Sequence, residues 1–378
     1  MKKNILFVAL AAILCIPSVR SIAQTDSIVN VFDSMTDRVF KIYCKPYDTN
    51  RDGILSEKEA SWVTEIDLGL NVIESLDGIE YFVNLEKLNC SWNRITRLDV
   101  SNNMKLTELI CHNNRLTELV LGDNSVLTEV DCNKNSITEL DASGCTALTK
   151  LSCANNQLTL LNTSGCAALS KLKCNNNQLT ALDVSSSKAL SELSCSNNQL
   201  ATLTIGENAT LYNLSCDNNQ LSSLELRAKG LIWLHCSNNQ LKMLDVSLSK
   251  NLSELSCSSN QLDSLSLNKN TGLKLADCSN NRLGSLNVSK NTALTSLSCS
   301  NNMLASLDIS ANKALSELSC GNNRLEELNI SNGALRYLSC VGNPKLDKVF
   351  VADSFNLEEP TASIAEIVKD AHTDFTKL

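Results

Sequence analysis

The sequence predicts a mostly β, broadly α+β solenoid of stacked parallel strands, preceded by a short helical cap. Three observations predict it: a 21-residue motif recurs along most of the chain, its apolar residues alternate as in short strands, and a helical, acidic segment comes before it. A fixed period in this range indicates a solenoid, because each unit is too small to bury its own apolar side and its stacked neighbours supply the core.

The repeat is clearest at residues 85–101, which read L-x-x-L-x-C-x-x-N-x-I-x-x-L-D-V-S. Thirteen cysteines hold the same position in successive copies, spaced by 21 residues except for two steps of 20. They are Cys90, Cys111, Cys132, Cys153, Cys174, Cys195, Cys216, Cys236, Cys257, Cys278, Cys299, Cys320 and Cys340. Fourteen repeats begin near residues 63, 85, 106, 127, 148, 169, 190, 211, 231, 252, 273, 294, 315 and 335.

Each repeat is expected to contain one short parallel strand, L-x-x-L-x-C, with Leu and Cys inward and the intervening residues in solvent. The Asn three residues after each Cys should also turn inward and bond to the turn backbone, because a buried amide is costly unless it is paired. The L-D-V-S segment should lie on the opposite side as a second, shorter extended piece, with Leu98 and Val100 inward and Asp99 outward.

The motif resembles the leucine-rich repeat, L-x-x-L-x-L-x-x-N-x-L, with Cys in place of the third Leu. Within that class it is similar to the 21-residue IRREKO type, and together with the N-terminal region it resembles secreted, internalin-like repeat proteins of bacteria. The resemblance covers roughly residues 63–352. It implies a curved solenoid that binds its ligand on the concave face and serves in adhesion or host contact.

The N-terminus has the features of a secretory signal: Lys2 and Lys3, an apolar stretch over 5–16, and a small-x-small cleavage site that ends at Ala23. Cys15 leaves a lipoprotein signal as an alternative, although Leu14 stands where such signals carry a small residue. The predicted organisation is a signal peptide (1–23), an EF-hand-like cap (24–62), the solenoid (63–356) and a C-terminal cap or tail (357–378).

The mature chain is expected to be extracytoplasmic, in the periplasm or at the cell surface. Residues 1–23 hold three of the 33 basic residues and none of the 41 acidic ones, so cleavage leaves a net charge of −11. An acidic protein is a poor candidate for binding nucleic acid or anionic lipid. No later segment is long and apolar enough to span a membrane.

The cysteines are interpreted as small inward-facing hydrophobes rather than disulfide partners or metal ligands. One thiol per rung makes a row, whereas zinc needs four ligands gathered around a point. Cys145 and Cys166 differ, because each follows Ser-Gly in the turn region of adjacent repeats. Their expected separation of one rung permits a disulfide, which stays an open alternative.

The N-terminal cap carries an EF-hand calcium motif. Ile28, Phe32, Met35, Val39 and Ile42 recur at helical spacing and predict one helix that ends at Pro46. A complete 12-residue loop follows, and a second short helix is expected over residues 60–65. The predicted calcium ligands are Asp48, Asn50, Asp52, the carbonyl of Ile54, Ser56 (through water) and Glu59, with Gly53 at the sharp turn.

The loop has a plain alternative, a solvated acidic turn before a helix. Only one loop is present, whereas signalling EF-hands work in pairs, so the resemblance is to dockerin-type or structural calcium sites. The hypothesis is that Ca²⁺ rigidifies the N-terminal cap.

Catalytic motifs are absent from the sequence, so no enzymatic activity is expected. The three histidines, His112, His235 and His372, belong to no recognisable Ser/His/Asp or metal-binding set. The residue between Leu and Cys is mostly Ser (Ser152, Ser194, Ser215, Ser256, Ser298, Ser319 and Ser339), which predicts a flat polar ribbon on the concave face.

The main ligand-binding candidates on that ribbon are Trp233 and His235, beside Asn213 and Glu254 on neighbouring rungs, because an exposed Trp is a common binding anchor. An acidic group, Glu108, Glu129 and Asp131, is followed by a basic group, Lys150, Lys171 and Lys173, which we interpret chiefly as solvated charge. Trp92 and His112 form a weaker patch.

The sequence therefore favours a secreted or surface-exposed module that binds a protein partner. The alternative is a carbohydrate-binding or cell-envelope structural protein, since a Ser- and Asn-rich face with Trp233 would also suit stacking on sugar.

Overall fold

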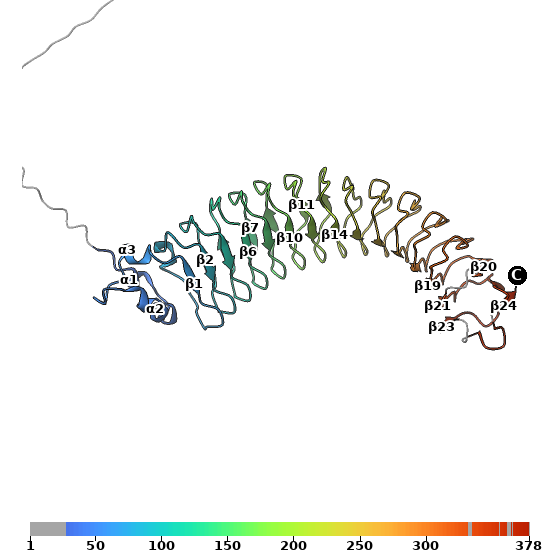
Figure 1. Cartoon of the computed structure of the whole chain (residues 1–378), viewed down its shortest axis with the longest axis horizontal. Coiled ribbons are helices and arrows are strands. Elements are labelled where there is room, and N and C mark those ends of the chain that lie inside the picture. The colour runs from blue at the N-terminus through green and yellow to red at the C-terminus, as the bar shows by residue number, and fades with distance from the viewer. Residues whose placement is uncertain (1–27, 332–334, 355, 361–363, 365, 378) are drawn as a thin grey trace, which may run out of the picture.

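The computed structural model describes residues 28–331, 335–354, 356–360, 364 and 366–377, and the predicted signal segment lies outside this part of the chain. Figure 1 shows a single curved stack of rungs, with the helices at its N-terminal end. The predicted solenoid of parallel strands is confirmed. Within the described residues, no helix is long and apolar enough to cross a membrane.

One long parallel sheet runs the length of the stack, along the inner side of the arc in Figure 1. It has fifteen strands, of which the first fourteen come from the fourteen predicted repeats. In spatial order they are β1 (Glu65–Asp67), β2 (Lys87–Asn89), β4 (Glu108–Ile110), β6 (Glu129–Asp131), β8 (Lys150–Ser152), β10 (Lys171–Lys173), β12 (Glu192–Ser194), β14 (Asn213–Ser215), β15 (Trp233–His235), β16 (Glu254–Ser256), β17 (Leu275–Asp277), β18 (Ser296–Ser298), β19 (Glu317–Ser319), β21 (Tyr337–Ser339) and β23 (Glu366–Val368).

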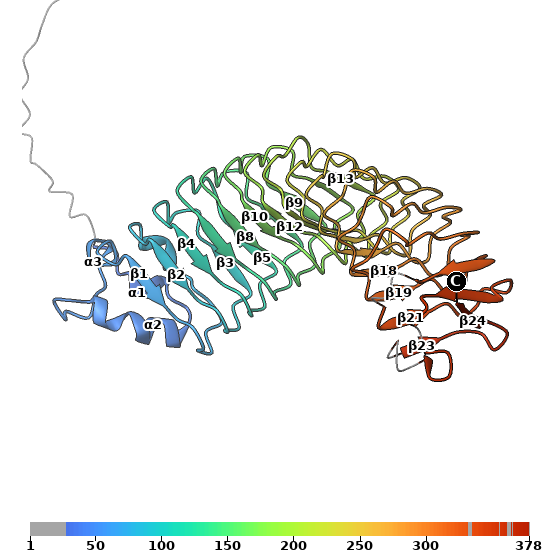
Figure 2. The ribbon, with the colours of Figure 1, turned by 45° about the vertical axis from the view of Figure 1, so that its right-hand side comes forward.

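The opposite side of the stack carries shorter parallel ladders, visible behind the long sheet in Figure 2. They pair β3 (Arg97–Asp99) with β5 (Glu118–Val120), β7 (Glu139–Asp141) with β9 (Leu160–Asn162), β11 (Ala181–Asp183) with β13 (Thr202–Thr204), and β20 (Glu327–Asn329) with β22 (Lys348–Val351) and β24 (Asp374–Lys377). As predicted, Leu98 and Val100 are buried, and Asp99 is half-buried on the outside.

The core is a stack of Leu and Cys layers. All thirteen repeat cysteines are at most 1% exposed, so the prediction that they point inward is confirmed. Burial raises the pKa of the thiols of Cys90 and Cys174 to about 12, which keeps them protonated near neutral pH. Cys145 and Cys166 are also buried, and both are free thiols, with Cys166 Sγ 3.2 Å from the carbonyl oxygen of Ala142.

The repeat asparagines form the predicted ladder in the turn after each long-sheet strand. Asn281 is typical: its Nδ2 donates to the carbonyls of Cys257 (3.0 Å), Cys278 (3.1 Å) and Ser279 (3.1 Å). Its Oδ1 accepts the backbone N–H of Leu262 at 3.0 Å. Each such amide therefore joins neighbouring rungs through both of its ends.

A second set of buried polar side chains lies in the opposite turn, and fewer of their hydrogen-bonding atoms have partners. Nδ2 of Asn291 donates to the carbonyls of Leu267 (3.0 Å) and Asn270 (2.8 Å), but its buried Oδ1 receives no hydrogen bond from the described residues. This position is also less uniform in sequence. It holds Asn103, Asn124, Cys145, Cys166, Ser187, Asn208, Ala228, Ser249, Asn270, Asn291 and Asn312 in successive rungs.

The N-terminal cap contains two helices where one was predicted over residues 28–42. They are α1 (Val31–Ser34) and α2 (Arg38–Cys44), followed by the 3-10 turn η1 (Lys45–Tyr47). The break occurs because Asp37 caps α2, accepting the N–H groups of Val39 (2.7 Å) and Phe40 (2.9 Å).

The predicted apolar face of the cap was also partly wrong. Phe32 and Met35 are buried as predicted, but Ile28 and Ile42 are exposed, and Val31, Phe40 and Cys44 are buried in addition. The next helix, α3 (Glu57–Ala60), is capped by Ser56 and ends at the first residue of the segment 60–65 that was predicted to be helical; the last residue of that segment begins β1.

The cap covers the open end of the first rung. Phe40 and Tyr47 pack on Phe82, with ring centroids 6.4 and 6.0 Å apart, beside the turn η2 (Ile79–Tyr81). Thr36 donates to Asp77 at 2.6 Å, and the N–H of Glu74 donates to Asp37 at 2.8 Å.

The other end is closed by strands that lie within the segment predicted as a C-terminal cap or tail. β23 extends the long sheet beyond β21, and β24 extends the outer ladder beyond β22. Ile364 is buried among the final rungs. The end rung is thereby covered by chain that no longer follows the repeat, as solenoids require.

Candidate functional site

The outward positions of the long sheet form rows of side chains in register, so residues 20 or 21 apart become neighbours. Asn213, Trp233 and Glu254 occupy the first position of β14, β15 and β16, and His235 occupies the third position of β15. The structure therefore brings the four predicted binding residues together. The seven predicted serines occupy the third position of their strands, among them β14 and β16, and are half-buried, as expected for a flat ribbon.

Trp233 is the centre of this group. Its side chain is 38% exposed, and its ring lies edge-on against that of Tyr212, with centroids 5.7 Å apart. Nε2 of His235 lies 3.4 Å from Oε1 of Glu254. The neighbouring side chains thus restrict the orientation of the indole and leave part of its surface in solvent.

The structure adds Tyr212 and Glu192, which the sequence interpretation missed. The Tyr212 hydroxyl donates a short hydrogen bond to Glu192, and Nζ of Lys171 lies 2.7 Å from the same carboxylate. These hydrogen bonds lower the pKa of Glu192, Lys171 being the largest cause. We call Glu192, Tyr212, Trp233, His235 and Glu254 the aromatic platform.

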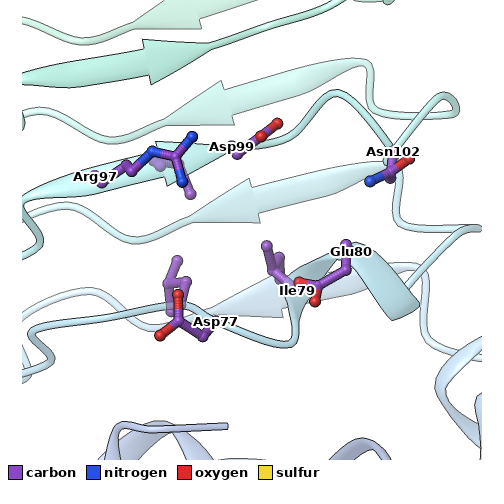
Figure 3. A pocket seen from close by; sticks show the side chains of 8 residues that line it. Asp77, Ile79, Glu80, Arg97, Asp99 and Asn102 are labelled. Carbon is purple, nitrogen blue, oxygen red and sulfur yellow. The ribbon is translucent and has the colours of Figure 1, made fainter. Parts of the chain in front are cut away.

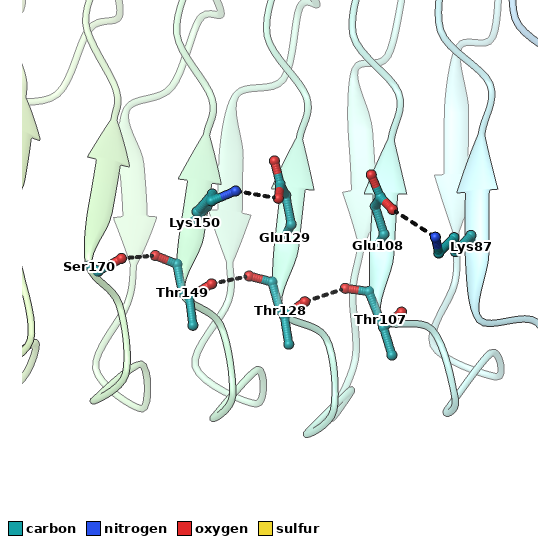
Figure 4. Close-up of polar contacts among 8 residues, drawn as sticks. All are labelled: Lys87, Thr107, Glu108, Thr128, Glu129, Thr149, Lys150 and Ser170. Carbon is teal, nitrogen blue, oxygen red and sulfur yellow. Dashed lines mark hydrogen bonds and ion pairs between the residues drawn. The ribbon is translucent and has the colours of Figure 1, made fainter.

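The missed signal was the residue type that precedes each strand. Most other rungs hold Thr or Ser there. In several of them the hydroxyl donates to a carbonyl of the preceding rung, as Figure 4 shows for Thr128, Thr149 and Ser170. A tyrosine at this point, Tyr212, departs from the ladder and places a ring beside the next strand.

The charged groups on the N-terminal strands of the long sheet pair with one another. Lys87 lies 3.9 Å from Glu108, and Lys150 lies 2.9 Å from Glu129, each on an adjacent strand (Figure 4). These side chains are largely exposed, so the pairs contribute about 0–1 kcal/mol each. The geometry agrees with the interpretation of solvated charge.

The weaker patch is also assembled. The ring of Trp92 lies edge-on to that of His112, with centroids 6.4 Å apart, and the indole is 53% exposed. His112 Nδ1 is 2.7 Å from the side-chain amide of Asn113.

The predicted calcium loop folds tightly around its own backbone. Asp48 accepts the N–H groups of Arg51 (2.8 Å) and Gly53 (3.0 Å), and Asp52 accepts that of Ile54 (2.8 Å). Asn50 accepts the N–H of Asp52 at 2.9 Å. Gly53 has a φ of +87°, the conformation that the sixth position of the motif requires.

Glu59 closes the loop. Its Oε1 accepts from the N–H and hydroxyl of Thr49, both at 2.9 Å, and its Oε2 accepts from the N–H (3.1 Å) and hydroxyl (2.8 Å) of Ser56. Hydrogen bonds from Ser56 are the main reason why the pKa of this buried carboxyl falls to about 2. Glu59 is therefore a carboxylate at neutral pH.

The loop thus offers hard oxygen donors and the expected backbone, which is the chemistry that calcium prefers. Its carboxylates do not yet converge: among the described residues, no three His, Cys, Asp or Glu side chains are grouped closely enough to hold a metal ion. In this structure Glu59 joins the two ends of the loop through hydrogen bonds.

A shallow pocket lies on the outer side of the first rungs (Figure 3). Its polar groups already have partners, since Asp77 binds Thr36, Arg97 pairs with Glu118 at 2.8 Å, and Asp99 accepts from Ser101 at 2.7 Å. We interpret this pocket as part of the joint between cap and solenoid.

Comparison with solved structures gives many similar folds. A functional domain of InlJ from Listeria monocytogenes, which includes a cysteine ladder, matches with a TM-score of 0.64 and 30% identity, over 89% of this chain and 78% of that one. YopM from Yersinia enterocolitica matches with a TM-score of 0.67 and 23% identity, over 90% and 73% of the two chains.

A plant peptide hormone receptor, RGFR1 in complex with RGF2, matches with a TM-score of 0.53 and 18% identity, over 79% of this chain and 64% of the receptor. No protein-family model and no curated protein matches the sequence. The structural matches share a solenoid of parallel strands with few helices.

Proposed function

Because this chain belongs to the leucine-rich repeat proteins, we propose that it is an exported, non-enzymatic binding module whose concave sheet recognises a protein partner. The observation that carries the proposal is the aromatic platform, where Trp233 stands exposed between ordered polar neighbours. The plant receptor of the same fold is seen in complex with a peptide hormone, which supports a protein or peptide ligand.

The aromatic platform has the properties of a binding hot spot. Trp and Tyr dominate such sites because they bury a large area at a small cost in side-chain entropy. Tyr212 is held by Glu192, and its ring lies against that of Trp233, so less freedom is lost when a partner binds. The serine rows on the surrounding strands allow close approach of a flat partner surface.

Export of the mature chain after cleavage near Ala23 is compatible with its many thiols. All sixteen described cysteines are buried, and burial raises the thiol pKa, for example to about 12 at Cys44 and about 11 at Cys340. Since the thiolate is the reactive form, these side chains resist oxidation in an oxidising compartment.

The binding proposal is tested with the mature chain and its Trp233→Ala variant. We expect a surface-protein pull-down to recover a partner with the parent chain and to lose it, by at least tenfold, with the variant. Leu160→Ser, on the outer strand β9, is the matched control for loss of an exposed apolar group. If the Trp233→Ala variant binds the partner as tightly as the parent chain does, the aromatic platform is not the binding site.

A glycan array probed with the same proteins distinguishes the alternative. Carbohydrate binding would also use the exposed indole, since sugars stack on aromatic faces, and the flanking Asn213 and Glu254 offer hydrogen bonds. Binding to defined glycans, abolished by Trp233→Ala and without a protein partner, would replace the protein-binding proposal by the carbohydrate one.

We further propose that Ca²⁺ binds the loop from Asp48 to Glu59 and rigidifies the cap, with Asp48, Asn50, Asp52, Ile54, Ser56 and Glu59 as its ligands. The support is the donor chemistry and the loop backbone. Calcium should raise the melting temperature of the parent chain and protect residues 28–62 from protease. Asp48→Ala with Asp52→Ala should abolish both responses. If chelator leaves both readouts of the parent chain unchanged, the calcium proposal is wrong.

A further inference from the structure

The turn that follows each long-sheet strand changes character at the N-terminal end of the solenoid. In this turn, the residue before the ladder asparagine has a φ of +52° to +62° wherever it is not glycine. Asn fills most of these positions, as expected, because its short polar side chain tolerates the left-handed conformation better than bulky side chains do. The first two rungs are different, since they place Leu70 and Trp92 there.

The stack itself imposes this conformation. The N–H of Leu70 donates to the carbonyl of Ser91 at 3.1 Å, and that of Trp92 to the carbonyl of His112 at 3.0 Å. Asn113 makes the same bond to its next rung, to Asn133 at 3.0 Å. Leu70 and Trp92 therefore hold an unfavourable backbone conformation that is required by their position.

Packing does not explain these two residues either. Leu70 is 80% exposed and Trp92 is 53% exposed, and Val72, two residues after Leu70, is 56% exposed. None of the three fills the core, which is completed below them by buried Ile73 and Ile95. Leu70 and Trp92 are large, exposed apolar residues whose backbone conformation is unfavourable for them. Residues of this kind indicate a role outside the stability of the fold.

Basic residues flank this apolar group. Arg94 and Arg115 are exposed at equivalent positions of successive rungs, and Lys134 is exposed one rung further on. Within the described residues, none of the three forms an ion pair. In the middle of the solenoid the position of Arg94 is held by an uncharged side chain, in Gln157, Gln178, Gln199, Gln220, Gln240 and Gln261.

We propose that this edge, made of Leu70, Val72, Trp92, Arg94, Arg115 and Lys134, binds an acidic segment of a protein partner that carries an apolar side chain beside its carboxylates. Trp and Arg are the residues most enriched at interface hot spots. A guanidinium binds a carboxylate with two parallel hydrogen bonds, and unpaired cations on a chain of negative net charge select for acidic ligands. We call these six residues the apolar–basic edge.

This surface is separate from the aromatic platform. Seven strand-to-strand steps lie between β2 and β15 in the long sheet, which is about 30 Å at about 4.8 Å per step. The two proposals can therefore fail independently, because Trp233→Ala leaves the apolar–basic edge unchanged.

A display library of random dodecapeptides, selected on the mature chain, tests the proposal. We expect enriched peptides to combine Asp or Glu with a neighbouring aliphatic or aromatic residue. A fluorescent copy of the best peptide should bind the Leu70→Asn/Trp92→Asn variant at least tenfold more weakly. Arg94→Gln/Arg115→Gln should remove the preference for acidic peptides over matched amide versions.

The asparagine variant also separates binding from folding. Because Asn is the residue that later rungs use here, the melting temperature should not fall, and a rise of about 1 °C is expected. Met243→Asn, which removes an apolar side chain that is 78% exposed in another rung, should leave peptide affinity unchanged.

Three results would overturn the proposal. The first is selection of peptides without acidic residues, or no selection at all. The second is a lower melting temperature of the Leu70→Asn/Trp92→Asn variant, which would show that these side chains serve the fold. The third is preferential binding to vesicles of anionic over neutral phospholipid that depends on these residues at least as strongly as peptide binding does. That result would assign the edge to a membrane surface.

Discussion

The cap and the solenoid hold their backbones with different chemistry. In the cap, carboxylates such as Asp37 and Glu59 accept clusters of backbone N–H groups. In the solenoid, neutral amides such as Asn281 join neighbouring rungs by accepting one backbone N–H and donating to backbone carbonyls, above a core that includes a row of thiols. A carboxylate can be lost by protonation and an amide cannot, whereas a buried thiol resists ionisation. The two regions should therefore respond to opposite extremes of pH.

The largest expected effect is alkaline unfolding of the solenoid. Burial raises the thiol pKa from 9.0 to about 12 at Cys90 and Cys174, so above pH 9 the unfolded chain releases protons that the folded chain retains. Each such thiol then removes about 1.4 kcal/mol of stability per pH unit between about pH 9 and 12. Circular dichroism should show a steep loss of the β-sheet signal of the solenoid as the pH rises above about 9, where the thiols of the unfolded chain ionise.

The control for this prediction is a variant in which two adjacent ladder thiols are removed, Cys195→Ala/Cys216→Ala. It should be less stable at neutral pH because of the cavities, but its stability should fall less steeply as the pH rises. An unchanged slope would contradict the assignment of alkaline unfolding to the thiol ladder.

Replacement of a core leucine tests whether rungs support one another. Leu193 is 1% exposed, and Leu193→Ala should cost about 2–5 kcal/mol through lost apolar burial and the cavity that remains. In a stack with only nearest-neighbour contacts, the damage should be greatest around that rung. Hydrogen exchange should show opening centred on β12, with residues 28–62 of the cap protected as before.

The two turns of one rung provide a matched pair of amides. Asn281→Ala leaves the buried N–H of Leu262 without its acceptor, whereas the three carbonyls that Asn281 bonds each keep another donor, so we expect a loss of about 1–3 kcal/mol. Asn291→Ser should cost about 1 kcal/mol or less, because Asn291 bonds through its Nδ2 alone and Ser249 stands at the equivalent position with a bond to Ala228 at 3.0 Å. Urea denaturation measures both losses. Equal decreases in the free energy of unfolding for the two variants would contradict the proposed difference between the two turns.

The smallest effect is acid opening of the cap. The pKa of Glu59 is about 2 in the folded chain, against an ordinary value of 4.5. Its contribution to stability is therefore complete above about pH 4.5 and is lost as the pH falls from there towards 2. Protease sensitivity of residues 28–62 should rise over this range while the solenoid strands stay protected. Glu59→Gln should show the same opening at neutral pH, and no further change on acidification would confirm that this carboxylate is responsible.

The solenoid was predictable because one local pattern is repeated and every copy must bury the same apolar positions against its neighbours. The inward Cys row, the ladder of Asn281 and its equivalents, and the outward Asp99 all follow from alternation within a strand. The cap was harder, because a helical period over residues 28–42 does not reveal that Asp37 would cap a second helix. The contribution of Tyr212 was likewise missed, since it depends on a neighbour 20 residues away.

The amino-acid sequence alone determined the stack, its period and the residues that face inward, because a repeating unit that cannot bury its own apolar side has only its copies to pack against. Tertiary structure decided what the outward residues do. Register between strands set Tyr212 against Trp233 and held Leu70 and Trp92 in a left-handed conformation at an exposed edge. These relations depend on where neighbouring rungs place their side chains in space, and no single repeat contains that information.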